Sequence, residues 1–168
     1  IKNSAFVGCI NLSAILIPQN IKSIGTAAFK NCASIGNIFS MHPYLTTIGD
    51  EAFYGCKSLI FDSIPSYVEI IGNRSFYGCE SLINLTIPRS VKEIKDFAFQ
   101  KSTNLTTITL DPNNKITITS NVFTDCSPNL ALIISTPKYY ISETALFSYF
   151  TKITVPNSVS RIYYNTFK

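Results

Sequence analysis

One aromatic residue recurs along this chain at a nearly constant interval. From Phe6 onward a phenylalanine stands every 23 or 24 residues, and a last one follows after a shorter step, giving the series Phe6, Phe29, Phe53, Phe76, Phe99, Phe123, Phe147 and Phe167. A period of about 20 to 30 residues is typical of a solenoid, in which each repeat buries its apolar face only against its neighbours. The spacing therefore predicts one column of stacked rings, and it directs the search for function to a surface instead of a cleft.

The residues around each phenylalanine predict a short helical turn. Side chains that can cap a helix stand three residues before it, at Asn3, Thr26, Asp50, Asn73, Asp96, Ser120 and Thr144. Residue types that tolerate a left-handed backbone stand two residues after most of them, at Gly8, Asn31, Gly55, Gly78 and Asp125. Each predicted helix is thus about one turn long.

Two apolar patterns follow each turn. The first alternates and ends at a proline, as in LINLTIP over residues 82–88, and it returns at residues 12–18, 105–110, 130–134 and 153–155. It predicts short strands that stack in parallel into one long sheet. The second is a pair of apolar residues three positions apart, such as Val91 and Ile94, and it predicts a short bent strand that closes the other side of the coil.

Residues 1–168 are accordingly expected to form a single solenoid of about seven repeats. We expect a fragment of a longer protein, because residues 1–9 already lie inside a repeat and no polar terminal cap precedes them. Residues 127–150 fit the pattern worst and are expected to form an irregular repeat. Asp62 falls where Leu85 points inward, which leaves either a buried functional carboxylate or a local bulge, and the bulge is favoured.

The sequence offers little for catalysis or for metal binding. The five cysteines each stand three residues after an anchor phenylalanine, and equivalent stacked side chains point the same way, so we expect free buried thiols instead of disulfides. The chain lacks a CxxC motif and has one histidine, His42, so no metal site, cofactor or nucleophile with its base is expected. An enzyme with a small-molecule substrate is therefore not predicted.

Charge and hydropathy argue against nucleic acid and membranes as partners of this chain. The net charge is +4 with the basic residues scattered, which indicates neither a nucleic-acid surface nor a basic membrane patch. No window approaches 18 consecutive apolar residues, so attachment to a membrane would need segments outside this chain. A hydrophobic fraction of 46% with 14% charged residues excludes a disordered tail. The remaining class is a folded repeat that binds another protein.

The repeat can be written AF-x-x-C-x-x-L-x-x-I-x-IP-x-x-V-x-x-IG, and it is similar to the BspA-like class of leucine-rich repeats. The resemblance covers nearly all of the chain and is strongest in AFVGCINL, AFYGCKSL, SFYGCESL, LTIPRSVKEI and ITVPNSVSRI. It implies an α/β-type solenoid, a right-handed coil with a parallel β-sheet on one face and one-turn helices or loops on the other. It also implies a cell-surface or secreted protein of mucosal bacteria or protist parasites that adheres to extracellular matrix or host cell proteins.

The outward row of the predicted sheet is the candidate binding surface. Strand residues that alternate with the inward apolar ones point out of the coil, and they are Leu16, Phe39, Phe61, Ser63, Asn84, Thr86, Thr107 and Thr109. A register slip that turns Phe39 and Phe61 inward is the alternative for those two positions. Two other functions stay open: an intracellular scaffold for a regulatory protein, and a structural spacer that binds nothing.

Four sequons are candidate acceptors of N-linked glycans, at Asn11, Asn73, Asn84 and Asn104. Asn73 is also one of the predicted helix caps. About as many sequons are expected by chance in a chain of this composition, so they permit a secreted setting without indicating one. Sugar on Asn84 or Asn104 in the native source would exclude the cytosol.

Overall fold

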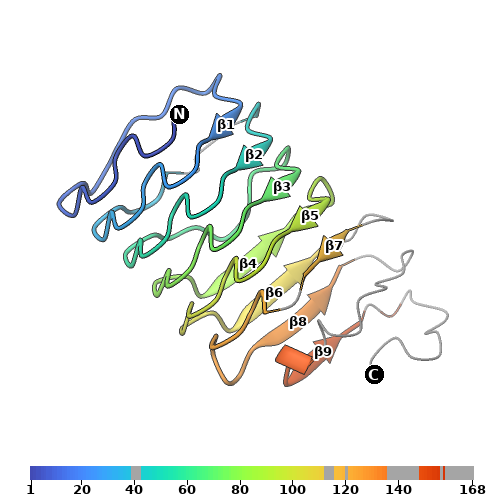
Figure 1. Cartoon of the computed structure of the whole chain (residues 1–168). Helices are drawn as coiled ribbons and strands as arrows, with labels where there is room; N and C mark the ends of the chain where they lie inside the picture. Colours follow the sequence, from blue (N-terminus) through green and yellow to red (C-terminus); the bar gives the residue numbers. More distant parts are fainter. Residues whose placement is uncertain (39–42, 112–115, 120, 136–147, 156, 158–168) are drawn as a thin grey trace.

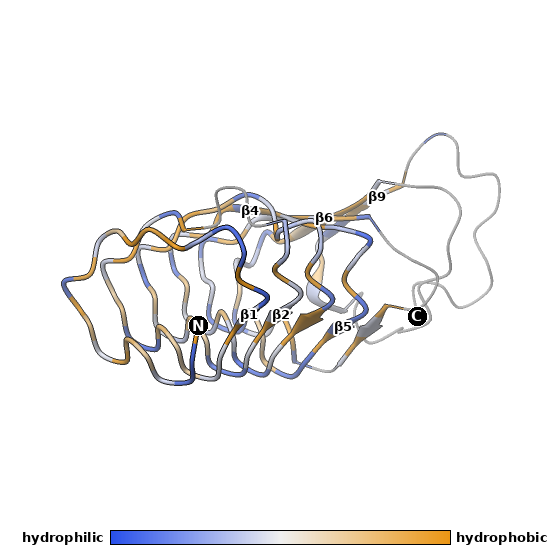
Figure 2. Ribbon diagram, turned by 90° about the horizontal axis from the view of Figure 1, so that it is seen from above, coloured by the Kyte–Doolittle hydropathy of each residue, from blue (hydrophilic) through white to orange (hydrophobic). Residues whose placement is uncertain are grey.

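The computed structural model describes residues 1–38, 43–111, 116–119, 121–135, 148–155 and 157. Within them the chain winds into coils that lie side by side along one axis (Figure 1). Two parallel sheets follow that axis, with strand orders β1-β2-β3-β5-β7 and β4-β6-β8-β9. Figure 2 shows β1, β2 and β5 along one side of the coils and β4, β6 and β9 along the other. The repeat therefore builds a solenoid, as its period predicted.

The first sheet is made of two-residue strands from the second apolar pattern. They are β1 (Ser23–Ile24), β2 (Thr47–Ile48), β3 (Ile70–Ile71), β5 (Glu93–Ile94) and β7 (Thr117–Ile118). The strands pair in register, and each ends on a buried isoleucine. The prediction of a short strand on this side of the coil is confirmed.

The second sheet comes from the alternating segments that end at proline, but it forms only over the later coils. Its strands are β4 (Asn84–Ile87), β6 (Thr107–Leu110), β8 (Ala131–Ile134) and β9 (Lys152–Thr154). Residues 12–18 form no strand, and the segment before β4 contributes one bridge, between Ser63 and Thr86. The predicted long sheet is thus shorter than the solenoid.

The side of the coil that carries the phenylalanines consists of consecutive turns, which corrects the prediction of one-turn helices. Within the described residues only Ser148 and Tyr149 are helical, in a 3₁₀ turn. The N–H groups of Ala28 and Lys30 donate within their own coil, to Gly25 and Ala27, whereas the N–H of Phe29 donates to the Ala52 carbonyl of the next coil at 2.8 Å. An α-helix would use all of these N–H groups internally. The turns instead use every second one to join neighbouring coils.

This alternation needs left-handed backbone at two places in each turn. The residues two after the phenylalanine were predicted correctly, since Gly8, Asn31, Gly55, Gly78 and Asp125 all have positive φ. The residues two before it were missed, because they include types that rarely adopt this conformation; they are Ser4, Ala27, Glu51, Arg74, Phe97 and Asn121, with φ between 49° and 65°.

The predicted helix caps have another role. The Asn3 side-chain oxygen accepts a hydrogen bond from the Thr26 backbone N–H at 2.9 Å, and that of Asp50 accepts one from the Asn73 N–H at 2.8 Å. In both pairs the donor is the equivalent residue of the following coil. These side chains therefore join coils and do not cap a helix.

The column of phenylalanine rings is confirmed from Phe6 to Phe123. Successive ring centroids lie 5.1, 5.3, 5.4, 5.2 and 5.6 Å apart with interplanar angles of 4° to 11°. After Phe123 the stacking changes, since its ring meets Tyr149 edge-on and Phe150 at a tilt. Phe147 and Phe167 lie outside the described residues. Burial of each ring stabilises the fold by about 1.5–3 kcal/mol.

The cysteines are free, as predicted, and they form a second column beside the rings. Four of the thiols donate to the backbone carbonyl of the anchor phenylalanine one coil earlier; the Sγ to oxygen distance is 2.9 Å from Cys32, 3.0 Å from Cys56, 3.3 Å from Cys79 and 3.1 Å from Cys126. Ser102 replaces cysteine in one coil and donates in the same way, at 3.2 Å. The thiols are thus hydrogen-bond donors as well as packing groups.

Not every cysteine is buried. Cys9 is exposed, which corrects the expectation for that residue, and Cys126 is half-buried. Burial in this fold comes from a coil on each side, and among the described residues a coil packs against that of Cys9 on one side. Burial raises the pKa of the Cys56 and Cys126 thiols to about 12. Those two thiols stay protonated at neutral pH and can keep donating.

Candidate functional site

The outward side chains of the second sheet form two straight rows. The pairing of β4, β6, β8 and β9 places Asn84, Thr107, Ala131 and Lys152 in one row and Thr86, Thr109, Ile133 and Thr154 in the other. Ser63 extends the second row through its bridge to Thr86. We call these side chains the strand face, together with the exposed Leu16 and Ile60 of earlier coils and Ile83, which directly precedes β4. They alternate with the buried Leu85, Ile108 and Leu132.

Most of the predicted contact residues point outward. Leu16 is 99% exposed, Ser63 and Asn84 are exposed, and Thr86, Thr107 and Thr109 are half-buried. Phe39 lies outside the described residues. The arrangement brings Ser63, Asn84 and the three threonines together on one surface.

Phe61 is a correction to the predicted outward row. It is 6% exposed, and its ring packs at 5.3 Å against Phe76, at an angle of 51°. Asp62, at the position where Leu85 is buried, is exposed instead. A carboxylate without a partner is costly to bury, so the chain turns Phe61 inward and Asp62 outward. Asp62 is therefore not the buried carboxylate that the sequence left open as one of two alternatives.

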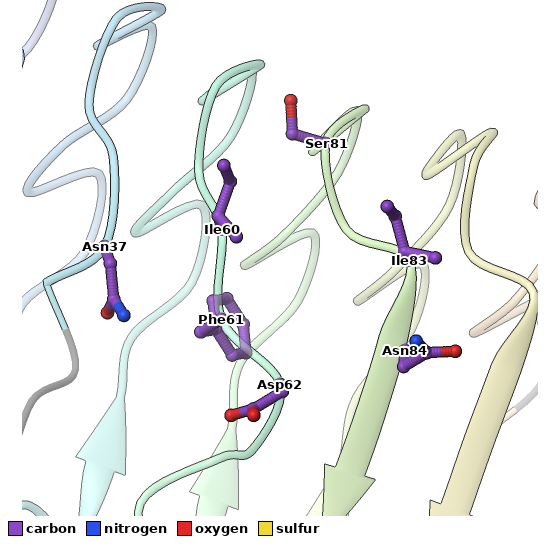
Figure 3. A pocket seen from close by; sticks show the side chains of 7 residues that line it. All are labelled: Asn37, Ile60, Phe61, Asp62, Ser81, Ile83 and Asn84. Carbon is purple, nitrogen blue, oxygen red and sulfur yellow. The ribbon is translucent and has the colours of Figure 1, made fainter.

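A shallow groove of about 310 Å³ opens at this irregular segment. Figure 3 shows Ile60, Phe61 and Asp62 following one another along one coil, with Ile83 and Asn84 on the next. Asn37 and Ser81 complete the lining. Ile60 is 59% and Ile83 56% exposed. Apolar walls and one carboxylate therefore share a single hollow beside the Asn and Thr rows.

The two isoleucines of the groove were missed by the outward row read from the sequence. A signal for them existed in the dipeptides Leu59-Ile60 and Leu82-Ile83. In an extended chain successive side chains point to opposite sides. Since Leu59 and Leu82 are fully buried, the residue that follows each of them has to face solvent.

A second hollow, of about 510 Å³, lies where each coil turns from one sheet toward the other. It is lined by Lys22, Pro43, Tyr44, Thr46 and Tyr67. Tyr44 and Tyr67 are 60% and 59% exposed. By contrast Tyr54 and Tyr77, on the turn side, stack on each other at 4.6 Å with Lys30 above Tyr54. The sequence analysis did not single out any of these tyrosines.

The geometry of the described residues offers no obvious reaction centre. No group of three or more His, Cys, Asp or Glu side chains within them could hold a metal ion. Both hollows are open to solvent, and Cys79 is fully buried with its pKa raised well above the ordinary value by desolvation. Among the described residues there is no helix that is long and apolar enough to cross a bilayer.

The sequons differ in accessibility. Asn11 and Asn84 are exposed. Asn104 is also exposed, and its Nδ2 donates to the Glu80 carbonyl at 2.8 Å, whereas Asn73 is half-buried. Because Asn84 lines the groove, a glycan on it would cover that part of the strand face.

Comparison with known proteins agrees with the architecture. A BspA type leucine-rich repeat region matches in six copies, over residues 1–61 and 46–168. A leucine-rich repeat protein of T. pallidum, TpLRR, shares 29% identity with this chain and superposes with a TM-score of 0.68. The match covers 82% of this chain and 63% of the TpLRR chain. One from Bacteroides ovatus ATCC 8483 shares 20% identity over 95% of this chain and 65% of its own, with a TM-score of 0.39. No curated protein matches.

The chain spans less than two-thirds of the length of both solved structures. The family match, in contrast, runs from residue 1 to residue 168. The protein belongs to the BspA-type leucine-rich repeat family.

Proposed function

We propose that this chain is a non-enzymatic protein-binding domain whose contact surface is the strand face. The observation that supports this proposal most is that Leu16, Ile60 and Ile83 are more than half exposed on a surface that carries little charge. Contiguous exposed apolar residues with a polar surround usually mark a site for another protein. Leucine-rich repeats generally mediate protein binding, which supports the same conclusion.

The proposed setting is a cell surface, with a host or extracellular matrix protein as the partner. The family resemblance supports this setting, since similar repeats occur in surface proteins of mucosal organisms that attach to host proteins. The exposed sequons at Asn84 and Asn104 are compatible with it.

Adhesion to immobilised laminin and collagen tests the proposal. A triple variant, Leu16→Glu, Ile83→Glu and Thr107→Glu, places three charges on the strand face and should reduce adhesion at least tenfold. A matched triple variant, Ser23→Glu, Ser66→Glu and Thr117→Glu, places three charges at exposed positions off that face and should adhere like the wild type. Circular dichroism checks that both remain folded. Equal adhesion by the two variants rejects the strand face, and no adhesion by the wild type rejects these matrix partners.

A second candidate, an intracellular scaffold for a regulatory protein, is favoured by one observation. All five cysteines are free, and free thiols are the usual state in a reducing compartment. Mass spectrometry of the protein from its native source separates the two settings. Glycan on Asn84 or Asn104 excludes the cytosol, whereas unmodified asparagines together with cytosolic fractionation reject the cell surface.

A further inference from the structure

The strand face carries little charge within the described residues. Its rows hold Asn, Thr, Ser, Ala and Ile side chains, with Lys152 on β9 as the basic residue. Two carboxylates from neighbouring segments are neutralised, because Glu80 pairs with Lys57 at 3.0 Å and Asp111 pairs with Arg89 at 3.0 Å. Asp62 differs from both. It is exposed and takes part in none of the ion pairs found among the described residues.

The surroundings of Asp62 are apolar on two sides. Ile60 and Ile83 stand on neighbouring coils and both line the groove that Asp62 lines (Figure 3). The buried Phe61 lies between Ile60 and Asp62 along the same coil. A volume of about 310 Å³ is at the low end of the range of about 300–1,000 Å³ for small-molecule sites. The groove therefore suits one long side chain better than a large ligand.

A basic side chain matches this combination of surfaces. The methylene stem of Lys or Arg packs on apolar surface while its charged head reaches a carboxylate. Arg fits better than Lys, because its planar guanidinium can form two parallel hydrogen bonds to a carboxylate and is more weakly hydrated. Asn84, a second polar side chain, also lines the groove.

We propose that the groove formed by Ile60, Ile83 and Asp62 binds an arginine side chain presented by the protein partner. The source of the arginine rests on the proposed function, whereas the recognition itself rests only on the groove. An acidic side chain would be repelled by Asp62. A neutral apolar side chain would use the isoleucines and leave the carboxylate without an added partner.

A pair of small probes separates charge from shape. N-acetyl-arginine N-methylamide and its citrulline counterpart have nearly the same size, but only arginine is charged. Each is titrated into the whole chain while the methyl signals of Ile60 and Ile83 and the Asn84 side-chain amide are followed by NMR. We expect arginine to shift these signals saturably and to bind on the order of tenfold more tightly than citrulline, as for a hydrogen-bonded charge pair.

Two variants complete the test. Asp62→Asn should reduce arginine binding to the citrulline level. Asp125→Asn removes another exposed carboxylate, on the turn side, and should bind arginine like the wild type. The proposal is overturned if arginine and citrulline bind equally, if neither binds, or if Asp62→Asn binds like the wild type.

These outcomes are independent of the matrix-adhesion experiment. If the strand-face triple variant loses adhesion while arginine fails to bind, the binding surface stands and the assignment of the groove falls. If arginine binds but the wild type adheres to neither laminin nor collagen, the groove stands and those partners are rejected.

Discussion

Residues 59–64 and 82–87 occupy the same place in neighbouring coils but fold differently. Their sequences are LIFDSI and LINLTI. The second contains the four-residue strand β4, whereas the first contributes a single bridge. The main difference is the third apolar position, which is Leu85 in one and Asp62 in the other.

One polar residue can interrupt the strand of a repeat without unfolding the repeat. Asp62 cannot enter the core unpaired, so Phe61 takes the inward place and the regular pairing is lost there. The turn side of the two coils is unaffected, since Phe53 and Phe76 stack and Cys56 and Cys79 make the same bond. An irregular strand side is tolerated because the turn side holds the coils together.

The largest expected effect comes from removing the ring that serves both coils. Phe76 packs against Phe53, Phe99 and Phe61 at 5.4, 5.2 and 5.3 Å. Phe76→Ala should lower the free energy of unfolding by about 3–5 kcal/mol, measured by urea denaturation. Phe6→Ala is the matched control, because Phe6 is half-buried and stacks on one ring. Similar losses of unfolding free energy in the two variants would show that packing against neighbouring rings is not what makes Phe76 important for stability.

Raising the pH above 9 should destabilise the turn side of both coils. The pKa of Cys56 is raised to about 12 from an ordinary 9.0 and that of Cys79 is raised well above 9.0, both mainly by desolvation. A raised pKa means that the folded state holds the proton more tightly, so stability is full below pH 9 and falls as the pH rises toward 12. By pH 10 the loss should be about 1 kcal/mol for Cys56, measured by urea unfolding.

The control for the alkaline loss is Cys56→Ser, which removes the thiol titration but keeps a donor. All other ionisable groups are shared by the wild type and this variant. The difference between their pH profiles therefore isolates the thiol. Parallel profiles from pH 8 to pH 10 would contradict the role of burial at Cys56.

Exchanging the residues that distinguish the two segments should convert the first into the second. The double variant Phe61→Asn, Asp62→Leu restores the alternating pattern, so the sheet should gain a strand before β4. The stability gain is expected to be small, about 1 kcal/mol, because one buried apolar residue replaces another and only a few hydrogen bonds are added. Amide hydrogen exchange should show new protection in residues 61–64. Unchanged exchange would mean that Asp62 is not what interrupts the sheet.

The smallest effect is expected at the thiol that donates across coils. Cys56→Ala leaves the Phe29 carbonyl without its donor and should lower stability by about 0.5–1.5 kcal/mol. Cys56→Ser should lose less, since Ser102 already donates from the equivalent position to Phe76. Thermal unfolding of the two variants provides the comparison. A serine variant less stable than the alanine variant would reject the donor role.

Much of this fold could be predicted from the sequence because the same pattern recurs along the chain. A position that is ambiguous in one repeat is resolved by the equivalent positions of the others. The period fixed the ring column, and the apolar pairs located the strands that end at Ile24, Ile48 and Ile71. The turns were predicted as helices because Asn3 and Asp50 are typical cap residues. That signal does not say whether the bonded N–H belongs to the same coil or to the next one.

The candidate site was less predictable. The Thr and Asn rows follow from simple alternation, and Thr107 and Thr109 point outward as expected. Alternation fails at Phe61, where the burial cost of a neighbouring charge decides the direction of the chain. A groove such as the one at Ile60 and Ile83 depends on how two adjacent coils meet, which the pattern of one repeat does not contain.

Hydrogen bonding in the turns has one more consequence. Around each anchor phenylalanine the coil donates N–H groups to the coil that follows it, as from Phe29 to the Ala52 carbonyl, and offers carbonyl acceptors to the coil before it, as Ala28 does to Phe6. A duplicated copy of the unit could thus be inserted without creating a new kind of contact, and units of 23 and of 24 residues keep the same bonds between turns. Duplication of one unit would lengthen such a solenoid by about 4.8 Å. The number of duplicated units therefore sets how far the protein extends.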